Sequence, residues 1–146
     1  MKTTGDQKRF DFWQDHSRNY LEMAYQMDKR ERLQDPAGYG KRTGVCGDTI
    51  EMFLMVEKGL IRTASFDTDG CLNTHACANT VVKMIEGKTI AAAWRTTVED
   101  VIDFLGTLPP AEIHCAELAV GALYLALTDQ QKMKQAPWKK IYKKHG

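Results

Sequence analysis

The sequence lacks the features that mark exported and membrane proteins. Its first twelve residues, MKTTGDQKRFDF, contain no apolar stretch like that of a secretory signal, and no apolar run reaches the length of a membrane span. We therefore expect a soluble, cytoplasmic protein without a membrane partner. The chain also lacks internal repeats and a domain linker. We expect one domain over residues 1–146, with flexible tails at residues 1–9 and 132–146.

Neither sign of charge is in marked excess, since 20 basic and 19 acidic residues give a net charge of +1. Six of the lysines lie in residues 132–146, where there is no acidic residue. A nucleic-acid-binding domain would spread its basic residues over a folded face, so we expect no nucleic-acid partner. The lysine-rich end is either a solvated tail or a docking strip for an acidic partner, with Trp138 and Tyr142 as apolar anchors.

Cysteine is scarce, and its four residues (Cys46, Cys71, Cys77 and Cys115) form no CxxC pair. This spacing excludes a compact zinc finger and a ferredoxin-type cluster motif. Thiols stay reduced in the cytosol, which argues against disulfides. The cysteines are therefore expected to bind metal, to react, or to be buried.

The apolar periodicity predicts an α+β fold with an N-terminal helix, a small antiparallel sheet and C-terminal helices on one face of it. The first helix is expected over residues 10–33, ended by Asp35-Pro36 and by the glycines at 38 and 40. Residues 49–57 and 60–66 are expected to form a hairpin turned at Lys58-Gly59.

Four helices are expected after the hairpin. The first starts after Cys71 and ends near Gly87, a short one covers residues 90–94, and a third follows the capping box that begins at Thr97. The last begins at Pro109-Pro110 and runs to about Leu127, with an inward face of Leu118, Ala119, Ala122, Leu125 and Ala126.

Three cysteines lie at the boundaries of these elements. Cys46 precedes the first hairpin strand and Cys71 follows the second, so both should lie at the open end of the hairpin. Cys71 also precedes a helix, whose N-terminus favours the thiolate. Cys115 lies in the last helix.

Three converging thiolates would repel one another unless a cation neutralises them, so the pattern favours a metal site. Asp48 and His114 are candidates for a fourth ligand. The alternative is that each cysteine is a small buried hydrophobe.

Three motifs, VCGDTIEM, FDTDGC and LPPAEIHCAELA, carry a family resemblance. They resemble, in order and separation, the cysteine motifs of the U-type iron–sulfur cluster scaffold proteins (the IscU/NifU/SufU family). By position, Cys46, Cys71 and Cys115 match the family's ligand cysteines. Asp48 matches an aspartate associated with cluster lability, and His114 matches the histidine beside the third cysteine. We therefore expect removal of the Asp48 carboxylate to lengthen the lifetime of the cluster.

The resemblance implies an IscU/SufE-like architecture and a scaffold rather than an enzyme. A cysteine desulfurase would supply sulfur, an iron donor would supply iron, and a [2Fe–2S] cluster would pass to acceptor apoproteins. A cluster could also bridge a homodimer, and zinc could occupy the same ligands in the isolated protein.

The chain departs from the family pattern at several positions. Its last motif carries Ala111-Glu112 where the family often has valine-lysine, so a dedicated Hsp70-type chaperone is not expected as a partner. His75 is either a spare ligand or a buried histidine, and Cys77 is expected in the core.

Two other functions remain open. The SufU branch resembles a zinc-dependent sulfur carrier with an insertion before its third cysteine, and the stretch between Cys71 and Cys115 is too short to hold one. The other alternative is a structural zinc-binding interaction module.

Overall fold

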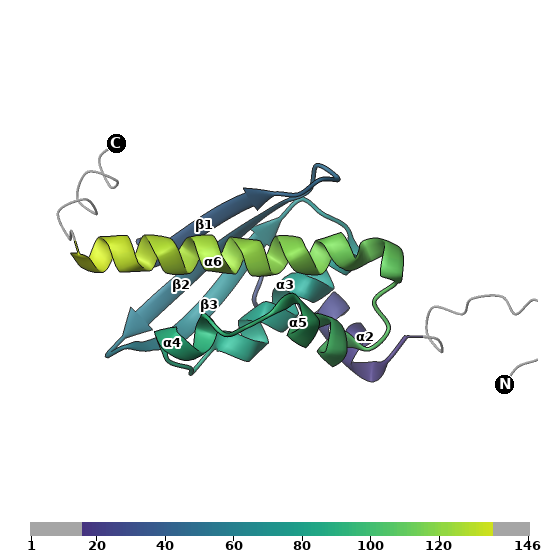
Figure 1. The fold of residues 1–146 in the computed structure, drawn as a ribbon, viewed down its shortest axis with the longest axis horizontal. Helices are drawn as coiled ribbons and strands as arrows, with labels where there is room; N and C mark the ends of the chain where they lie inside the picture. Colours follow the sequence, from purple (N-terminus) through teal and green to yellow (C-terminus); the bar gives the residue numbers. More distant parts are fainter. Residues whose placement is uncertain (1–15, 136–146) are drawn as a thin grey trace, which may run out of the picture.

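The computed structural model describes residues 16–135 as a three-stranded antiparallel sheet with helices on one face (Figure 1). This confirms the predicted α+β class. The elements in chain order are α2 (Arg18–Tyr25), β1 (Gly38–Thr43), β2 (Thr49–Glu57), β3 (Leu60–Thr68), α3 (Leu72–Ile85), α4 (Ile90–Ala93), α5 (Val98–Leu105), the 3-10 turn η1 (Pro110–Glu112) and α6 (Ile113–Gln135).

The predicted hairpin is confirmed as β2 and β3. Lys58 and Gly59 form its two-residue turn with φ angles of 55° and 78°, the left-handed values that such turns require. The strands pair from Glu57 opposite Leu60 at the turn to Ile50 opposite Thr68 at the open end. The residues that flank the two strands, including both predicted cysteine motifs, therefore meet at that open end.

The strand β1 was not predicted. Gly38 and Gly40 were expected only to end a helix, but they begin a strand that pairs with β2. A Cβ atom on Gly40 would lie 2.4 Å from the backbone nitrogen of Ala126 and 2.5 Å from the carbonyl oxygen of Ala122. Since α6 lies directly against β1, these glycines are needed for close contact rather than for a turn.

The prediction of one helix over residues 10–33 was wrong at both ends of the range that the structure describes. Helix α2 starts after the cap residue Ser17 and ends at Tyr25, while residues 10–15 lie outside the described part of the chain. The side-chain amide of Asn79 donates to the carbonyls of Met23 (2.7 Å) and Gln26 (2.8 Å). It satisfies backbone groups that a longer helix would have paired internally.

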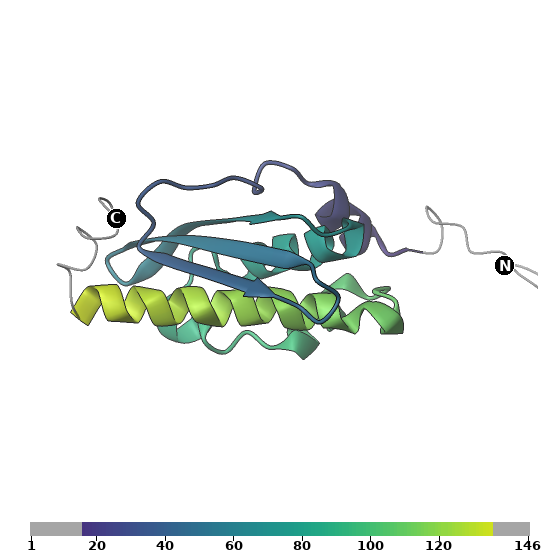
Figure 2. The same cartoon turned by 90° about the horizontal axis from the view of Figure 1, so that it is seen from above.

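Residues 26–37, which we call the crossing segment, run instead along the sheet. The backbone nitrogen of Phe66 donates to the Lys29 carbonyl (3.0 Å), and that of Glu31 donates to the Phe66 carbonyl (2.9 Å). These bonds cover the outer edge of β3, which would otherwise expose unpaired backbone groups. In Figure 2 the crossing segment lies on the opposite side of the sheet from α6.

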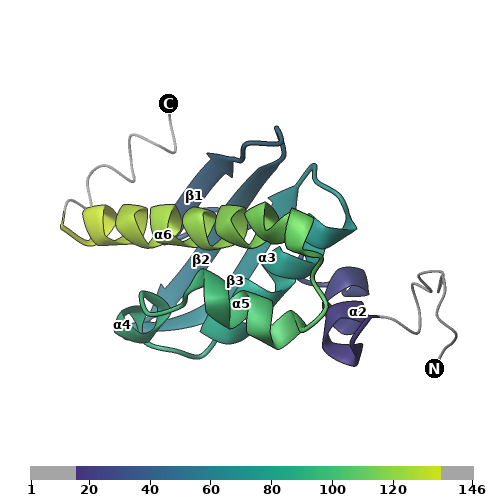
Figure 3. The same ribbon diagram turned by 45° about the vertical axis from the view of Figure 1, so that its right-hand side comes forward.

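Helices α3, α4 and α5 lie where the sequence predicted. Gly87 and Gly106 follow α3 and α5 with φ angles of 81° and 75°, and Thr97 forms its capping box with Asp100. Helix α3 lies between β3 and α6 and is buried on most sides (Figure 3). Its Cys77 is fully buried in the core, as predicted.

Helix α6 departs from its prediction in two ways. It continues past Leu127 to Gln135, so residues 132–135 are helical rather than part of a tail. Leu125 was expected to face inward but is 44% exposed, because the face that contacts β1 is lined by Ala122 and Ala126.

By length and composition alone, the stretch Pro110–Gln135 could cross a membrane. However, 56% of its most apolar window is buried inside the fold, as expected for a core helix. The tail at residues 1–9 and the rest of the lysine-rich end lie outside the described residues.

Candidate metal centre

Cys46 lies in the short turn between β1 and β2. The turn is closed by a hydrogen bond from the Gly44 nitrogen to the Asp48 carbonyl (2.8 Å), and Gly47 takes a φ angle of 91°. Cys46 is exposed, and its neighbour Val45 is 94% exposed. No hydrogen bond links the Cys46 thiol to another candidate ligand within residues 16–135. Cys46 is therefore accessible to solvent but is not hydrogen-bonded to the other candidate ligands in this range.

Cys71 is the N-cap residue of α3, as predicted from its position before the helix. Its backbone is extended and its side chain makes no capping hydrogen bond. The thiol is exposed, and its Sγ lies 3.9 Å from the Thr74 hydroxyl one turn later. Cys71 is therefore accessible to solvent and also contacts the buried Thr74 hydroxyl.

Cys115 occupies the first turn of α6 and is almost completely buried. Its Sγ lies 3.4 Å from the hydroxyl of Thr74, which itself is fully buried. The same hydroxyl donates to Oδ2 of Asp48 at 3.2 Å. Thr74 thus joins Asp48, Cys71 and Cys115, although these residues come from a loop and two helices.

Thr74 was not predicted from the sequence as part of the site. Its one local signal is its position three residues after Cys71, which places it on the same side of a helix that starts there. Its contacts with Asp48 and Cys115 depend on the packing of α3 against α6, which no short motif reports.

A second cluster shares Cys115. Among the described residues, the donor atoms of Glu112, His114 and Cys115 all lie within 4.8 Å of one another. Oε1 of Glu112 lies 3.6 Å from the Cys115 sulfur and 3.8 Å from Nε2 of His114. His114 and Cys115 were predicted as ligands from the sequence, whereas Glu112 stood out there only for its unexpected charge.

Burial raises the pKa of the Cys115 thiol to about 12. The Thr74 hydrogen bond opposes this shift, whereas the charges of Cys71 and Glu112 and the Glu112 hydrogen bond reinforce it. In the metal-free protein the thiol is therefore protonated at neutral pH. A cation bound here would displace that proton and take over the stabilisation of the thiolate.

The predicted ligand set is thus divided between three places. Asp48, Cys71 and Cys115 meet at Thr74, His114 and Cys115 meet at Glu112, and Cys46 lies on the exposed turn. Thiolate, imidazole and carboxylate together suit iron or zinc rather than magnesium or calcium. The arrangement fits a centre that holds such a metal between α3, α6 and the two loops.

His75 is buried, with 6% of its surface exposed. Its Nδ1 lies 2.8 Å from the Ala24 carbonyl, which can only accept, so Nδ1 carries the proton. Its Nε2 has no hydrogen-bond partner among the described residues. His75 also contacts the Phe66 ring in an edge-on arrangement. Its surroundings therefore fit a buried histidine better than a metal ligand.

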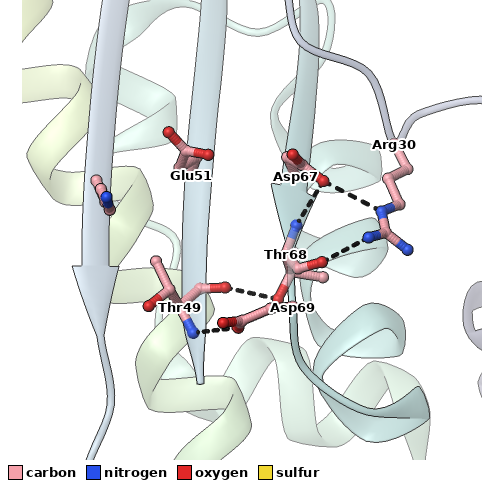
Figure 4. Close-up of a pocket in the computed structure, with 7 residues that line it drawn as sticks. Arg30, Thr49, Glu51, Asp67, Thr68 and Asp69 are labelled. Carbon is pink, nitrogen blue, oxygen red and sulfur yellow. Dashed lines mark hydrogen bonds and ion pairs between the residues drawn. The ribbon is translucent and has the colours of Figure 1, made fainter. Parts of the chain in front are cut away.

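A polar pocket opens on the face of the sheet beside the centre (Figure 4). Arg30 of the crossing segment contacts the Asp67 carboxylate (3.2 Å) and the Thr68 carbonyl (2.6 Å). The backbone nitrogen of Thr49 donates to Oδ1 of Asp69 at 2.8 Å. These contacts hold the ends of β2 and β3 together, and so hold the loops that carry Asp48 and Cys71.

Two curated relatives match much of the chain. It is 37% identical over 129 residues to the iron-sulfur cluster assembly scaffold protein IscU of Buchnera aphidicola, covering 77% of this chain and 98% of that protein. It is 34% identical over 99 residues to the iron-sulfur cluster assembly scaffold protein IscU 1 of Archaeoglobus fulgidus. That match covers 67% of this chain and 65% of the relative, just under two thirds of its length.

A solved structure shares the fold. The crystal structure of the N-terminal part of a nitrogen-fixing NifU-like protein from Brucella abortus superposes with a TM-score of 0.66 at 15% identity. The match covers 80% of this chain and 94% of that one.

The family described as "NifU-like N terminal domain" matches residues 27–136, a range that contains all three predicted cysteine motifs. This chain therefore belongs to the NifU-like N-terminal domain family of U-type scaffold proteins.

Proposed function

We propose that this chain is an iron–sulfur cluster assembly scaffold. It assembles a transient [2Fe–2S] cluster on Cys46, Cys71 and Cys115 and transfers it to acceptor apoproteins. The observation that carries the proposal is the meeting of Asp48, Cys71 and Cys115 at the buried Thr74 hydroxyl. Family membership and the names of the two relatives support it.

The three cysteines would have different roles because their exposure differs. Cys71 is exposed at the start of α3, where a cysteine desulfurase could deliver sulfur to it. Cys46 is exposed on a turn and would bind the cluster from the solvent side. Cys115 is buried in α6 and would attach the cluster to the protein core.

Asp48 would make the cargo releasable. A carboxylate is a harder ligand than a thiolate, and it binds the iron of an iron–sulfur cluster more weakly. Asp48 faces the site already, since its Oδ2 accepts the Thr74 hydrogen bond at 3.2 Å. A scaffold needs such a weak position because it must give up its cluster to an acceptor.

Anaerobic reconstitution tests the proposal. The protein is incubated with a cysteine desulfurase, cysteine and ferrous iron, followed by visible spectroscopy and analysis of iron, sulfide and zinc. We expect colour with stoichiometric iron and sulfide in the wild type, and its loss in Cys46→Ser, Cys71→Ser and Cys115→Ser. Cys77→Ala is the matched control, because Cys77 is fully buried in the core and is not one of the three proposed ligand cysteines.

Two outcomes would overturn the scaffold function. A colourless protein that holds zinc through the same cysteines and accelerates the desulfurase would be a sulfur carrier. A protein that unfolds when a cysteine is replaced and never changes desulfurase activity would be a structural zinc module.

A further inference from the structure

The Glu112 carboxylate is half-buried beside an imidazole and a thiol, two kinds of side chain that bind metals. Its side chain is 32% exposed, and no lysine or arginine pairs with it among the described residues. Its closest polar neighbours are the His114 imidazole and the Cys115 thiol, both of which bind metals. The negative charge of Glu112 is not balanced by a lysine or arginine of the described chain, and it faces an imidazole and a thiol. A bound metal cation would supply the missing positive charge.

Local backbone geometry brings the three donors together. Pro110 starts the 3-10 turn η1, which ends at Glu112, and α6 begins at the next residue. The tight turn and the first helical turn place residues 112, 114 and 115 so that their donor atoms lie within 4.8 Å of one another. Since all three lie within four residues, the set forms without help from either cysteine loop.

The other candidate ligands lie outside this set. In the hydrogen-bond network, Cys71 and Asp48 are each connected to Cys115 through the Thr74 hydroxyl. Cys46 is on the exposed turn between β1 and β2. The centre therefore has a local half made by Glu112, His114 and Cys115, and a second half that depends on the loops.

We propose that Glu112 is a metal ligand. With His114 and Cys115 it forms a mononuclear site for a divalent cation of borderline softness, such as Fe²⁺ or Zn²⁺, that fills without sulfide and without Cys46 or Cys71. One oxygen, one nitrogen and one sulfur donor suit such a cation and leave further positions open. This deepens the proposed function: the site holds iron first and leaves the exposed Cys71 free to accept sulfur.

The test uses Co²⁺ as a spectroscopic probe, added anaerobically without sulfide to the metal-free full chain. Binding through Cys115 gives thiolate-to-cobalt charge-transfer absorbance, and a titration gives stoichiometry and affinity. We expect one Co²⁺ per chain and loss of the absorbance in Cys115→Ser. Glu112→Gln keeps the shape of the side chain and should weaken binding by about 10-fold or more, since even outer-shell contacts of a metal contribute that much.

The matched control is Glu117→Gln, which removes an exposed acid from the next turn of α6 and should leave the affinity unchanged. Cys46→Ser and Cys71→Ser should also bind as the wild type does. Circular dichroism and thermal unfolding verify that each variant is folded. If Glu112→Gln affects folding, Glu112→Asp, which retains the carboxylate, should bind with intermediate affinity.

Two results would overturn the proposal: Glu112→Gln binding as tightly as the wild type, or Cys46→Ser or Cys71→Ser losing Co²⁺ as completely as Cys115→Ser. Failure of the scaffold function would look different. In that case the wild type would bind Co²⁺ through Glu112 and yet assemble no cluster with the desulfurase and iron.

Discussion

At the scale of single residues, one hydroxyl group organises the centre. Thr74 is fully buried and contacts Asp48, Cys71 and Cys115. It donates to the carboxylate, and the thiols share its remaining hydrogen-bonding capacity. Without it, Asp48 would lose the one hydrogen bond by which its side chain is held in the site among the described residues.

Thr74→Val should therefore destabilise the metal-free protein although it keeps the volume of the side chain. We expect a loss of about 1 kcal/mol in the free energy of unfolding, the usual net value of a hydrogen bond, measured by urea denaturation. Thr74→Ser retains the hydroxyl and serves as the control for side-chain chemistry. Equal unfolding free energies for Thr74→Val and the wild type would show that the hydroxyl positions nothing.

At the scale of elements, the packing of α6 against β1 determines where Cys115 lies. The contact is close because β1 presents glycines to the backbone of α6 at Ala122 and Ala126. Leu123 and Leu127 complete the burial of the helix. A shift of α6 would move Cys115 away from Thr74, so the packing of these two elements and the geometry of the centre are linked.

Gly40→Ala should disturb this packing. The added Cβ would meet backbone atoms of α6 at 2.4 and 2.5 Å, and backbone cannot move aside as a side chain can. We expect a destabilisation of about 2–3 kcal/mol, in the range of overpacked cores, measured by chemical denaturation.

Gly44→Ala is the matched control for that change, since its Cβ would meet only the Leu118 side chain, at 3.5 Å or more. A Gly40→Ala protein as stable as Gly44→Ala would mean that α6 does not lie as close to β1 as described.

At the scale of the whole molecule, charge holds the crossing segment to the sheet. Arg32 pairs with Glu51 of β2 and with Asp67 of β3, and its guanidinium lies 5.3 Å from the centre of the Phe53 ring. The hydroxyl of Tyr39 also donates to Glu51. The Arg32 hydrogen bond lowers the pKa of Glu51; burial opposes this, and the Tyr39 bond adds to it.

This arrangement predicts how stability depends on pH. The folded-state pKa of Glu51 lies below its ordinary value of 4.5, so ionised Glu51 stabilises the fold fully above about pH 4.5. That contribution is lost as the pH falls through the folded-state pKa. Glu51→Gln should thus be less stable than the wild type at pH 7, and the difference should shrink between pH 4.5 and pH 3.

Urea midpoints measured from pH 7 to pH 3 test this dependence. The control is Glu57→Gln, whose ion pair with Arg62 lies on the surface and is expected to contribute little. A difference between Glu51→Gln and the wild type that stays constant down to pH 3 would contradict the role of the ionised carboxylate.

Elements with local signals could be predicted from the sequence. The Lys58-Gly59 turn, the Thr97 capping box and Gly87 each act on residues within four positions, and each appears in the structure where expected. The same holds for Cys71 at the start of α3. The three cysteine motifs also identified the family before any fold was known.

Local signals were enough to predict the fold class, the hairpin, the starts of α3, α4 and α5, and the family, because turns, caps and periodicity depend on neighbouring residues. Other features depend on contacts between residues that are far apart in the chain. Asn79 ends α2 from 53 residues away, and Thr74 meets Cys115 across 41. The grouping of Glu112 with His114 and Cys115 depends on a single backbone turn whose side-chain directions no pattern of residue types specifies. The contacts of Asn79 and Thr74 form only when separate elements pack, and so their physical cause lies in the assembled core.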